Sequence, residues 1–417
     1  MEYKKYKLGD ICKIFGRIGF RGYTTEDLVL SPSYGAISLS PSNIVDGIMD
    51  LSKCTYISWA KYEESPEIKI APNDIVIVKT GNSYGRTAII RNVEHPMTLN
   101  PQFVVLKDIQ INPVYLAYFL KTDEFQKQIY GIVGGSAIPT LSQEDLASLI
   151  VRVPNENFQN TIADILDSLD GKIELNKQIN DNLEAMAKQL YDYWFVQFDF
   201  PNEEGKPYKS SGGAMVWNEK LKREIPQGWT TANIFDELSV QYGFPFSTDL
   251  FAEEPTNIPV VRIRDILENS VSAYSREEAD EKYKLQKQDL LIGMDGNFHM
   301  NYWNDNVSYL NQRSVRLRAN PNSTVSILQA RYDIAPYIKA KELRAKGSTV
   351  GHLSDKDLKE LFVLVSPNAD FRNKFDSILA EIIENRCEIE SLTKQRDELL
   401  PLLMNGQASV NYHLSDD

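Results

Sequence analysis

Residues 158–195 read FQNTIADILDSLDGKIELNKQINDNLEAMAKQLYDYWF, and residues 371–404 read FRNKFDSILAEIIENRCEIESLTKQRDELLPLLM. Both stretches place apolar residues in a narrow seam with the alternating three- and four-residue spacing of a coiled coil. The first seam consists of Ile162, Ile165, Leu169, Lys172, Asn176, Ile179, Leu183, Met186 and Leu190. The second, 213 residues later, consists of Phe375, Ile378, Ile382, Asn385, Ile389, Leu392, Arg396, Leu399 and Leu403. Seven of nine positions are apolar in each, which predicts two long helices that pair. Two ordinary amphipathic helices are the alternative.

Four polar residues interrupt these seams: Lys172, Asn176, Asn385 and Arg396. A polar residue inside a coiled-coil seam lowers stability but penalises misaligned pairings. We therefore expect the four residues to fix the register of the helices. The residues predicted to pair the helices are Ile165, Leu169, Asn176, Ile179, Leu183, Ile378, Ile382, Asn385, Ile389 and Leu392.

Length and composition indicate a globular protein of several domains. A chain of 417 residues is too long for a single hydrophobic core. Its 42% of hydrophobic residues is typical of a globular protein. It has no N-terminal signal pattern and no apolar run of about 18 residues, so we expect a cytoplasmic protein without a membrane span. The three cysteines are far apart and the four histidines fall in no ligand spacing. We expect neither a disulfide framework nor a metal site.

The net charge of −13 is concentrated in the two helical segments. Residues 156–195 hold eight acidic and three basic side chains, and residues 367–417 hold ten acidic and five basic ones. The globular segments are close to neutral. These segments are compatible with local binding to DNA. We expect that binding to be weak unless a partner neutralises further phosphates.

The globular segments before the two helices repeat each other. Residues 284–292 correspond to 69–77, Gly296-Asn297 to Gly81-Asn82, and residues 353–358 to 141–146. A period of about 213 residues indicates domain duplication. The fold class predicted is α+β: two duplicated globular α/β domains separated by two long helices that form an antiparallel coiled coil. The predicted bounds are 1–155 for the first domain, 156–200 for its helix, 201–225 for a linker, 226–367 for the second domain, 368–406 for its helix and 407–417 for a tail.

Two local predictions concern helix starts. Asn112-Pro113 opens a helix expected to run to about Ile129, because Pro is favoured in the first helical turn. The long helix is expected to begin at Asn157 as its N-cap. At 1.5 Å per residue, a helix of about 38 residues spans roughly 57 Å, which exceeds one turn of duplex DNA.

No motif indicates catalysis by this chain. Asn112-Pro113-Val114-Tyr115 resembles the Asn-Pro-Pro-Tyr loop of amino-methyltransferases, but Val114 breaks it and no Gly-rich cofactor loop precedes it. The sequence also contains no Gly-x4-Gly-Lys-Ser/Thr phosphate loop. We expect no catalytic residue, so methyl transfer and cleavage would come from partners.

Reading a DNA sequence requires bidentate side chains on loops that enter the major groove, with Arg or Lys suited to guanine and Asn or Gln to adenine. The DNA-binding candidates of the first domain are Arg17, Arg21, Lys79, Asn82, Ser83, Tyr84 and Arg86. Those of the second domain are Gln241, Tyr242, Arg262, Arg264, Asn297, His299, Asn301 and Arg313. For each of these residues taken singly, the alternative role is to form a turn, to pack in the core or to position a phosphate.

The chain resembles the specificity subunits of type I restriction-modification enzymes. The likeness rests on the ordered series of residues 74–86, 136–146, 153–154, 162–170, 190–201, 225–229 and 399–406. The resemblance implies two target recognition domains, each reading one half of a bipartite DNA target. It implies that the helices act as spacer and dock two adenine-methyltransferase subunits, to which restriction subunits with motor and nuclease activity add. S-adenosylmethionine, Mg and ATP are then expected on those partners, with no cofactor on this chain.

Two other classes of function compete with a DNA reader. One is a protein-interaction scaffold or an acidic DNA mimic, although a mimic should spread acidic residues over its whole surface. The other is an enzyme in its own right, which the missing cofactor, metal and nucleophile motifs disfavour.

Overall fold

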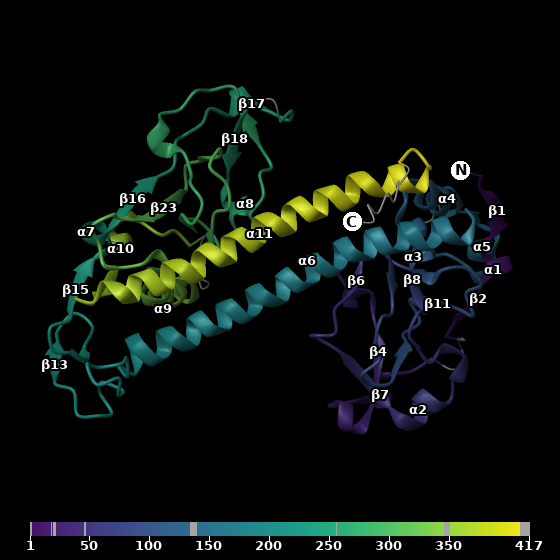
Figure 1. Ribbon diagram of the computed structural model, residues 1–417, viewed down its shortest axis with the longest axis horizontal. Helices are drawn as coiled ribbons and strands as arrows, with labels where there is room; N and C mark the ends of the chain where they lie inside the picture. The colour runs from purple at the N-terminus through teal and green to yellow at the C-terminus, as the bar shows by residue number, and fades with distance from the viewer. Residues whose placement is uncertain are drawn as a thin grey trace, which may run out of the picture. The chain divides into compact units, whose positions relative to one another are not determined.

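The computed structural model describes residues 2–17, 19, 22–45, 47–133, 140–255, 257–345 and 351–408 (Figure 1). The chain divides into two units. Unit 1 comprises Met1–Lys172 and Leu392–Asp417, and unit 2 comprises Ile173–Ser391. Each long helix therefore contributes residues to both units. The predicted tail lies mostly outside the described residues, which end at residue 408.

Unit 1 contains two four-stranded sheets. One has the order β2 (Lys13–Gly16), β11 (Phe103–Lys107), β8 (Ile75–Val78) and β9 (Thr87–Ile89), with all pairs antiparallel. The other has the order β10 (Met97–Leu99), β4 (Gly35–Leu39), β7 (Thr55–Ser58) and β3 (Leu28–Val29). All four residues of β8 are buried; its sequence, Ile-Val-Ile-Val, is the unbroken β-branched run typical of a buried strand.

Unit 2 repeats both sheets in the same order. Its first sheet runs β16 (Leu238–Tyr242), β23 (Ser314–Ala319), β20 (Leu290–Gly293) and β21 (Met300–Tyr302). Its second sheet, read in the direction that matches unit 1, runs β22 (Tyr309–Leu310), β18 (Ile258–Val261), β19 (Tyr274–Ser275) and β17 (Phe251–Ala252). The β10–β4 pair of unit 1 and the β22–β18 pair of unit 2 are both parallel. The predicted duplication of an α+β domain is thus present down to strand direction.

Matching short elements frame the two units. In unit 1, β1 (Lys4–Lys7) pairs with β12 (Ile150–Val153); in unit 2, β15 (Thr230–Asn233) pairs with β24 (Phe362–Val365). The short helices are α1 (Leu8–Ile11), α2 (Trp59–Glu63) and α5 (Gln143–Ser148) in unit 1, and α7 (Ile234–Glu237), α8 (Ile263–Glu268) and α10 (Asp355–Leu358) in unit 2. Two further hairpins are β5 (Ile44–Val45) with β6 (Ile48–Met49), and β13 (Met215–Asn218) with β14 (Arg223–Pro226).

The helix predicted from Asn112 to about Ile129 is two helices, α3 (Pro113–Lys121) and α4 (Asp123–Val133). Thr122 separates them in an extended conformation, and its hydroxyl accepts a hydrogen bond from the Phe125 N–H. At the start of α3, Asn112 Oδ1 accepts from the N–H groups of Val114 and Tyr115. The methyltransferase-like tetrapeptide is therefore an N-cap followed by Pro at the first helical position. In unit 2 one helix, α9 (Ile327–Ala345), takes this place in the chain.

The long helices α6 (Glu156–Tyr191) and α11 (Ala369–Met404) lie antiparallel in both units. Within unit 1, Arg396 Nη1 lies 2.8 Å from Asp170 Oδ1. Within unit 2, Asn176 Nδ2 donates to Glu388 at 2.9 Å, and Asn385 Nδ2 donates to Asn180 Oδ1 at 3.0 Å. As residue numbers rise along α6 they fall along α11, which is the pairing direction the two seams predict.

Of the nine residues predicted for the seam of α6, all of them described, two are buried: Ile162 and Asn176. Alongside Ile162 and Asn176, the buried residues of α6 include Leu166, Ile173, Asn180 and Ala187. The predicted positions Ile165, Leu169, Ile179 and Leu183 are half-buried, Lys172 is exposed, and Met186 is 48% exposed. In α11, Ile382, Asn385 and Leu392 are buried and Ile378 and Ile389 half-buried. The sequence does not distinguish adjacent apolar positions when small or polar residues such as Ala187 and Asn180 occupy the interface.

Both ends of α6 are set by side chains near them. The helix begins at Glu156, and Asn155 rather than Asn157 accepts the capping hydrogen bond from the Phe158 N–H. At the other end a π-helical turn, Asp192–Val196, leads into an aromatic cluster. Trp194 lies 4.6 Å from Phe371 and Phe195 lies 5.3 Å from Trp229, both between ring centroids. The aromatic stretch therefore joins α6 to the core of unit 2.

Among the described residues, no helix combines the length and apolar composition that crossing a bilayer requires.

Candidate nucleic-acid interface

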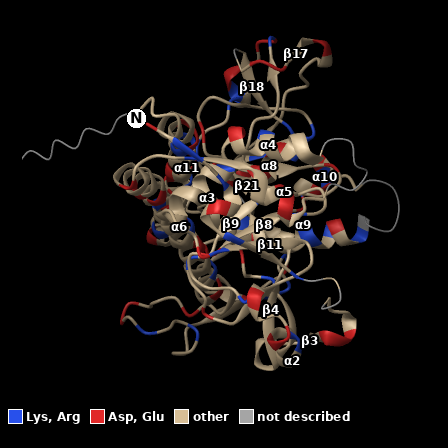
Figure 2. Cartoon of the chain, turned by 90° about the vertical axis from the view of Figure 1, so that its right-hand side faces the viewer, with Lys and Arg blue, Asp and Glu red and all other residues tan. Residues whose placement is uncertain are grey.

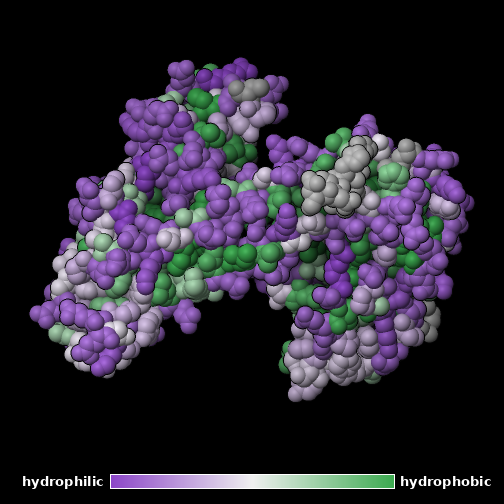
Figure 3. Space-filling model, viewed as in Figure 1, coloured by the Kyte–Doolittle hydropathy of each residue, from purple (hydrophilic) through white to green (hydrophobic). Residues whose placement is uncertain are grey.

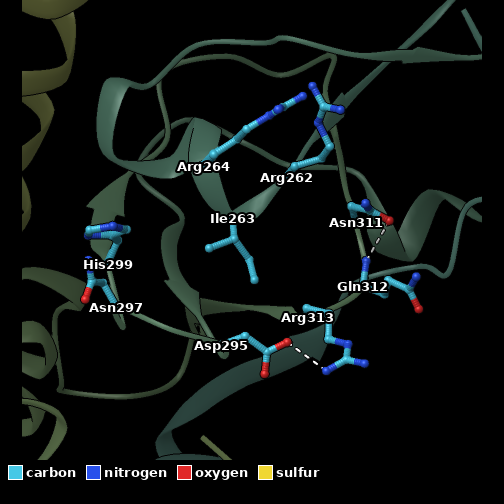
Figure 4. Close-up of a pocket in the computed structure, with 9 residues that line it drawn as sticks. All are labelled: Arg262, Ile263, Arg264, Asp295, Asn297, His299, Asn311, Gln312 and Arg313. Atoms are coloured by element: carbon cyan, nitrogen blue, oxygen red, sulfur yellow. Dashed lines mark hydrogen bonds and ion pairs between the residues drawn. The ribbon is translucent and has the colours of Figure 1, made fainter. Parts of the chain in front are cut away.

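A pocket of about 470 Å³ lies in unit 2 where three loops meet (Figure 4). Each loop follows from the end of a buried strand: β18 leads into the start of α8, β20 into its turn with β21, and β22 into β23. The polar side chains lie around Ile263 in Figure 4. The residues that line the pocket are Arg262, Ile263, Arg264, Asp295, Asn297, His299, Asn311, Gln312 and Arg313.

Backbone hydrogen bonds hold the loop between β22 and β23 in place. The Asn311 N–H donates to the Val261 carbonyl at 3.0 Å, and the Gln312 N–H donates to the Phe244 carbonyl at 2.8 Å. Gly243 packs directly against this loop, because a Cβ added there would lie 1.8 Å from the Asn311 carbonyl oxygen. The loop is therefore fixed before any ligand binds.

Asp295 joins two basic side chains at the pocket. Its carboxylate oxygens lie 2.7 Å from Arg313 Nη1 and 2.6 Å from His352 Nδ1. Burial acts to raise the pKa of Asp295, but the hydrogen bonds from His352 and Arg313 outweigh it and hold that pKa below its usual value. Asp295 is therefore an ionised carboxylate at neutral pH that orients Arg313.

The two arginines at the start of α8 have different environments. Arg262 Nη2 donates to the carbonyl and hydroxyl oxygens of Ser272, at 2.8 and 2.5 Å. The Arg264 side chain is 68% exposed and its nearest carboxylate, Asp265, lies 3.9 Å away. Arg262 is held by the fold, whereas Arg264 is available to an anionic ligand.

Three candidates of the second domain do not line this pocket. Gln241 Nε2 donates to the Tyr242 carbonyl at 2.8 Å, and the Tyr242 hydroxyl donates to Asp355 at 2.5 Å. Asn301 Nδ2 donates to the carbonyl oxygens of Ile266 and Leu267, while its Oδ1 accepts from Arg386 of α11. The expectation that Asn301 reads DNA is corrected, because both ends of its amide serve the interior of unit 2.

In unit 1 the turn between β8 and β9 carries five of the seven candidates. Asn82 and Arg86 are exposed, whereas Lys79, Ser83 and Tyr84 are half-buried. Burial lowers the pKa of Lys79, and the Tyr84 ring packs edge-on against Tyr130 at 5.7 Å. Asn82 and Arg86 are thus the side chains of this turn most accessible to a ligand.

Of the other two candidates of unit 1, the structure describes Arg17 alone. Arg17 is buried, and its guanidinium donates to the Leu99 carbonyl at 2.9 Å and to the Thr98 hydroxyl at 3.2 Å. The prediction that Arg17 contacts DNA is corrected, because its hydrogen bonds join β2 to β10. Arg21 lies outside the described residues.

Matching hydrogen bonds align positions in the two sites, although the backbone is left-handed at Arg313 and not at Gln102. The Lys79 N–H donates to the Gln102 carbonyl in unit 1, as the Met294 N–H donates to the Arg313 carbonyl in unit 2. The next residue of each turn forms an isolated bridge, Thr80 with Thr140 and Asp295 with His352. Gln102 in unit 1 therefore occupies the place of Arg313 in unit 2.

The sites of the two units contain residues that were not among the candidates from the sequence. Asp295, Asn311 and Gln312 were missed in unit 2, and Gln102 was missed in unit 1. The repeat carried a signal for three of them, since residues 311–313 lie near the place of residues 100–102 in the duplicated order.

The side chains at these sites are mainly hydrogen-bond donors and acceptors. No group of three His, Cys, Asp or Glu side chains suited to a metal exists among the described residues. Figure 2 shows Lys/Arg and Asp/Glu positions mixed around β17 and β18. Arginine, asparagine, glutamine and histidine on fixed loops are the side-chain types that recognise base edges and phosphates.

Comparison with known proteins gives a consistent relationship. The family model described as "Type I restriction modification DNA specificity domain" matches residues 1–185 and 226–398. The chain is 28% identical to the type I restriction enzyme MjaIX specificity subunit of Methanocaldococcus jannaschii, over 82% of this chain and 79% of that protein. It is 26% identical to the EcoBI specificity subunit of Escherichia coli, over 40% of this chain and 36% of that protein.

A solved structure shares the fold. The type I restriction-modification system S subunit from M. genitalium superposes with a TM-score of 0.59 at 16% identity, covering 96% of each chain. The family model matches most of the chain in two copies, one for each unit's sheets. The chain therefore belongs to the type I restriction-modification DNA specificity domain family.

Proposed function

We propose that this chain is the DNA sequence-specificity subunit of a type I restriction-modification system and performs no catalysis itself. Each unit would read one half of a bipartite DNA target. The observation that carries this proposal is the repeated loop framework, in which the same backbone hydrogen bonds present Gln102 in one unit and Arg313 in the other. A repeated framework with different side chains suits two readers of two different sequences.

The long helices would set the spacing of the two half-sites. Each of α6 and α11 is 36 residues long, or about 54 Å at 1.5 Å per residue. That length exceeds one turn of duplex DNA, about 34 to 36 Å.

An uncovered apolar stripe on α6 supports docking of a partner. Leu175 and Met186 are 56% and 48% exposed, and Ile179 and Leu183 between them are half-buried. These four residues share one side of the helix by the 3.6-residue period. Figure 3 shows hydrophobic residues along this helix on the visible face. We infer that the stripe packs against one of two adenine-methyltransferase subunits.

Reaction chemistry would belong to those partners. Methyl transfer needs S-adenosylmethionine, which we assign to the methyltransferase subunits. Cleavage and translocation need Mg and ATP, which we assign to restriction subunits that join the complex. Our proposal gives this chain no cofactor of its own.

Domain exchange tests the proposal. Residues 1–155 are replaced by the equivalent domain of a relative, the chain is expressed with its methyltransferase, and methylated adenines are mapped by direct sequencing of the host genome. One half of the methylated motif should change while the other half and the spacing stay the same. A change in both halves, or in neither, would contradict the two-reader proposal.

The competing proposal is an acidic DNA mimic or protein-interaction scaffold. It is favoured by the acidic long helices but not by the near-neutral composition of the globular domains. Salt-sensitive retention of duplex DNA by the complex of this chain with its methyltransferase distinguishes the two, because a mimic would not retain DNA.

A further inference from the structure

The Arg313 guanidinium binds Asp295 through Nη1 and leaves the edge formed by Nη2 and Nε open. Nη1 lies 2.7 Å from Asp295 Oδ2, and the side chain is 62% exposed. Within the described part of the chain, Nη2 and Nε form no hydrogen bond that competes with a ligand. Figure 4 shows the guanidinium at the edge of the pocket beside Gln312. Two parallel N–H donors therefore remain available in a fixed orientation.

The backbone at Arg313 is left-handed, with φ of +69°. Most residues with a Cβ are disfavoured there, whereas Gly, or Asn with its short polar side chain, adopts this conformation at lower cost. Non-glycine residues in this region cluster at functional sites, where the side chain has a purpose that outweighs the strain. An exposed ion pair contributes little to stability, so the Asp295 contact alone does not explain an arginine at this position.

Resting on the proposed function, we propose that Arg313 reads a guanine in the half-site of the second domain and that Asp295 is its positioning residue. The free Nη2 and Nε edge matches the O6 and N7 acceptors of guanine in the major groove, the commonest specific contact between protein and DNA. Asp295 fixes the plane of the guanidinium, and His352 holds the second carboxylate oxygen 2.6 Å away. The ordering of the side chain is thus completed before DNA binds.

The equivalent position of the first domain carries a different reader. Gln102 is exposed, and its Oε1 accepts from Asn100 Nδ2 at 3.2 Å. Thr80 stands in the place of Asp295, so no carboxylate supports a cation there. An amide favours adenine through N6 and N7. The same place in the two half-sites is therefore a G·C pair for the second domain and an A·T pair for the first.

The test uses the full chain in complex with its methyltransferase. Wild type, Arg313→Gln, Asp295→Asn and the control Arg276→Gln are compared by two readouts. The first is the methylated motif in the host genome. The second is competition binding of the purified complexes to duplexes that carry each base pair at each position of the second half-site. Arg276 is an exposed arginine of the same domain that does not line the pocket.

Arg313→Gln should lower discrimination for G·C by about 10- to 100-fold at one position of the second half-site. Asp295→Asn should lower it less at the same position, and Arg276→Gln should not change the motif. If a variant no longer methylates DNA in the host, the competition binding measurement alone is used to judge its base preference. Loss at a single position supports the inference, whereas equal weakening at all positions overturns it, because a phosphate contact behaves in that way.

Two further outcomes separate this inference from the proposed function. If the wild-type motif holds no G·C pair in its second half, or if Arg313→Gln leaves the motif unchanged, Arg313 is not a base reader. The domain exchange would still succeed in either case. If the domain exchange changes both halves of the motif or neither, the proposed function itself is contradicted.

Discussion

Asn385 of α11 donates a hydrogen bond from Nδ2 to Asn180 Oδ1 of α6 at 3.0 Å, and both side chains are 8% exposed. Asn180 in turn donates to the Ile382 carbonyl at 3.3 Å. Two buried amides are thus joined by a hydrogen bond inside the α6–α11 interface of unit 2. A buried polar pair of this kind specifies register, because shifted pairings leave each amide without a partner.

We expect Asn180→Leu and Asn385→Leu to be strongly non-additive. Each single substitution leaves one buried amide unsatisfied and should lower the free energy of unfolding by about 1–3 kcal/mol. The double substitution removes both amides and should recover most of that loss. Chemical denaturation of all four proteins in a double-mutant cycle measures the coupling. Additive losses would show that the two amides act independently.

Asp333 should make stability depend on pH in the mildly acidic range. Burial raises its pKa to about 6, although hydrogen bonds from Tyr191, the Leu364 N–H and Gln329 act to lower it. The folded state therefore binds a proton more tightly than the unfolded state. The stabilisation from this proton is fully present below about pH 4 and is lost as pH rises through about 6, on the order of 2–3 kcal/mol in total.

The variant Asp333→Asn isolates this contribution. Relative to wild type, it should gain stability between about pH 4 and pH 6.5 and keep a constant difference above that range. Denaturation midpoints of both proteins at pH 4.5, 5.5, 6.5 and 7.5 give the comparison. A difference that does not vary with pH would place the carboxyl's titration outside this window.

The sequence predicts the architecture of this chain better than its site. The duplication follows from the internal repeat, the antiparallel helices from apolar periodicity, and the buried strand at residues 75–78 from an unbroken β-branched run. The pocket follows from tertiary contacts instead. Arg17 looked like a DNA ligand because it stands in a Gly-rich loop, yet its guanidinium joins β2 to β10. Asp295 was missed because a carboxylate is repelled by phosphates, and its role comes from the contact with Arg313.

Met186→Glu should weaken binding of the methyltransferase without unfolding this chain. The residue lies in the exposed apolar stripe of α6, so an added carboxylate would be desolvated on docking. The matched control is Ala185→Glu, which places the same charge on an exposed position about 100° around the helix. Size-exclusion chromatography of the co-expressed subunits and thermal unfolding of this chain are the measurements. Equal effects of the two variants on assembly would exclude the stripe as a docking surface.

Arg264→Ala should weaken DNA binding without changing the motif. Its guanidinium is exposed and only distantly paired with Asp265, which suits a phosphate contact. Loss of one such contact lowers the slope of log binding constant against log salt concentration by about 0.9. Titration of the methyltransferase complex with duplex DNA at several salt concentrations measures the slope. A change in base preference at one position, with an unchanged slope, would assign Arg264 to base reading.

Transferring the second domain's reader into the first should change one base pair of the first half-site. The double substitution Thr80→Asp with Gln102→Arg introduces the supporting carboxylate and the guanidinium at the positions that match Asp295 and Arg313. The single substitution Gln102→Arg lacks the carboxylate and serves as the comparison. We expect the double variant to prefer G·C over A·T at one position by about 10-fold or more. The single variant should discriminate less, because its guanidinium is not oriented before binding. Mapping methylated adenines in a host that expresses each variant reads the outcome. A change confined to the second half-site would show that the matched hydrogen bonds do not place these residues at equivalent positions on DNA.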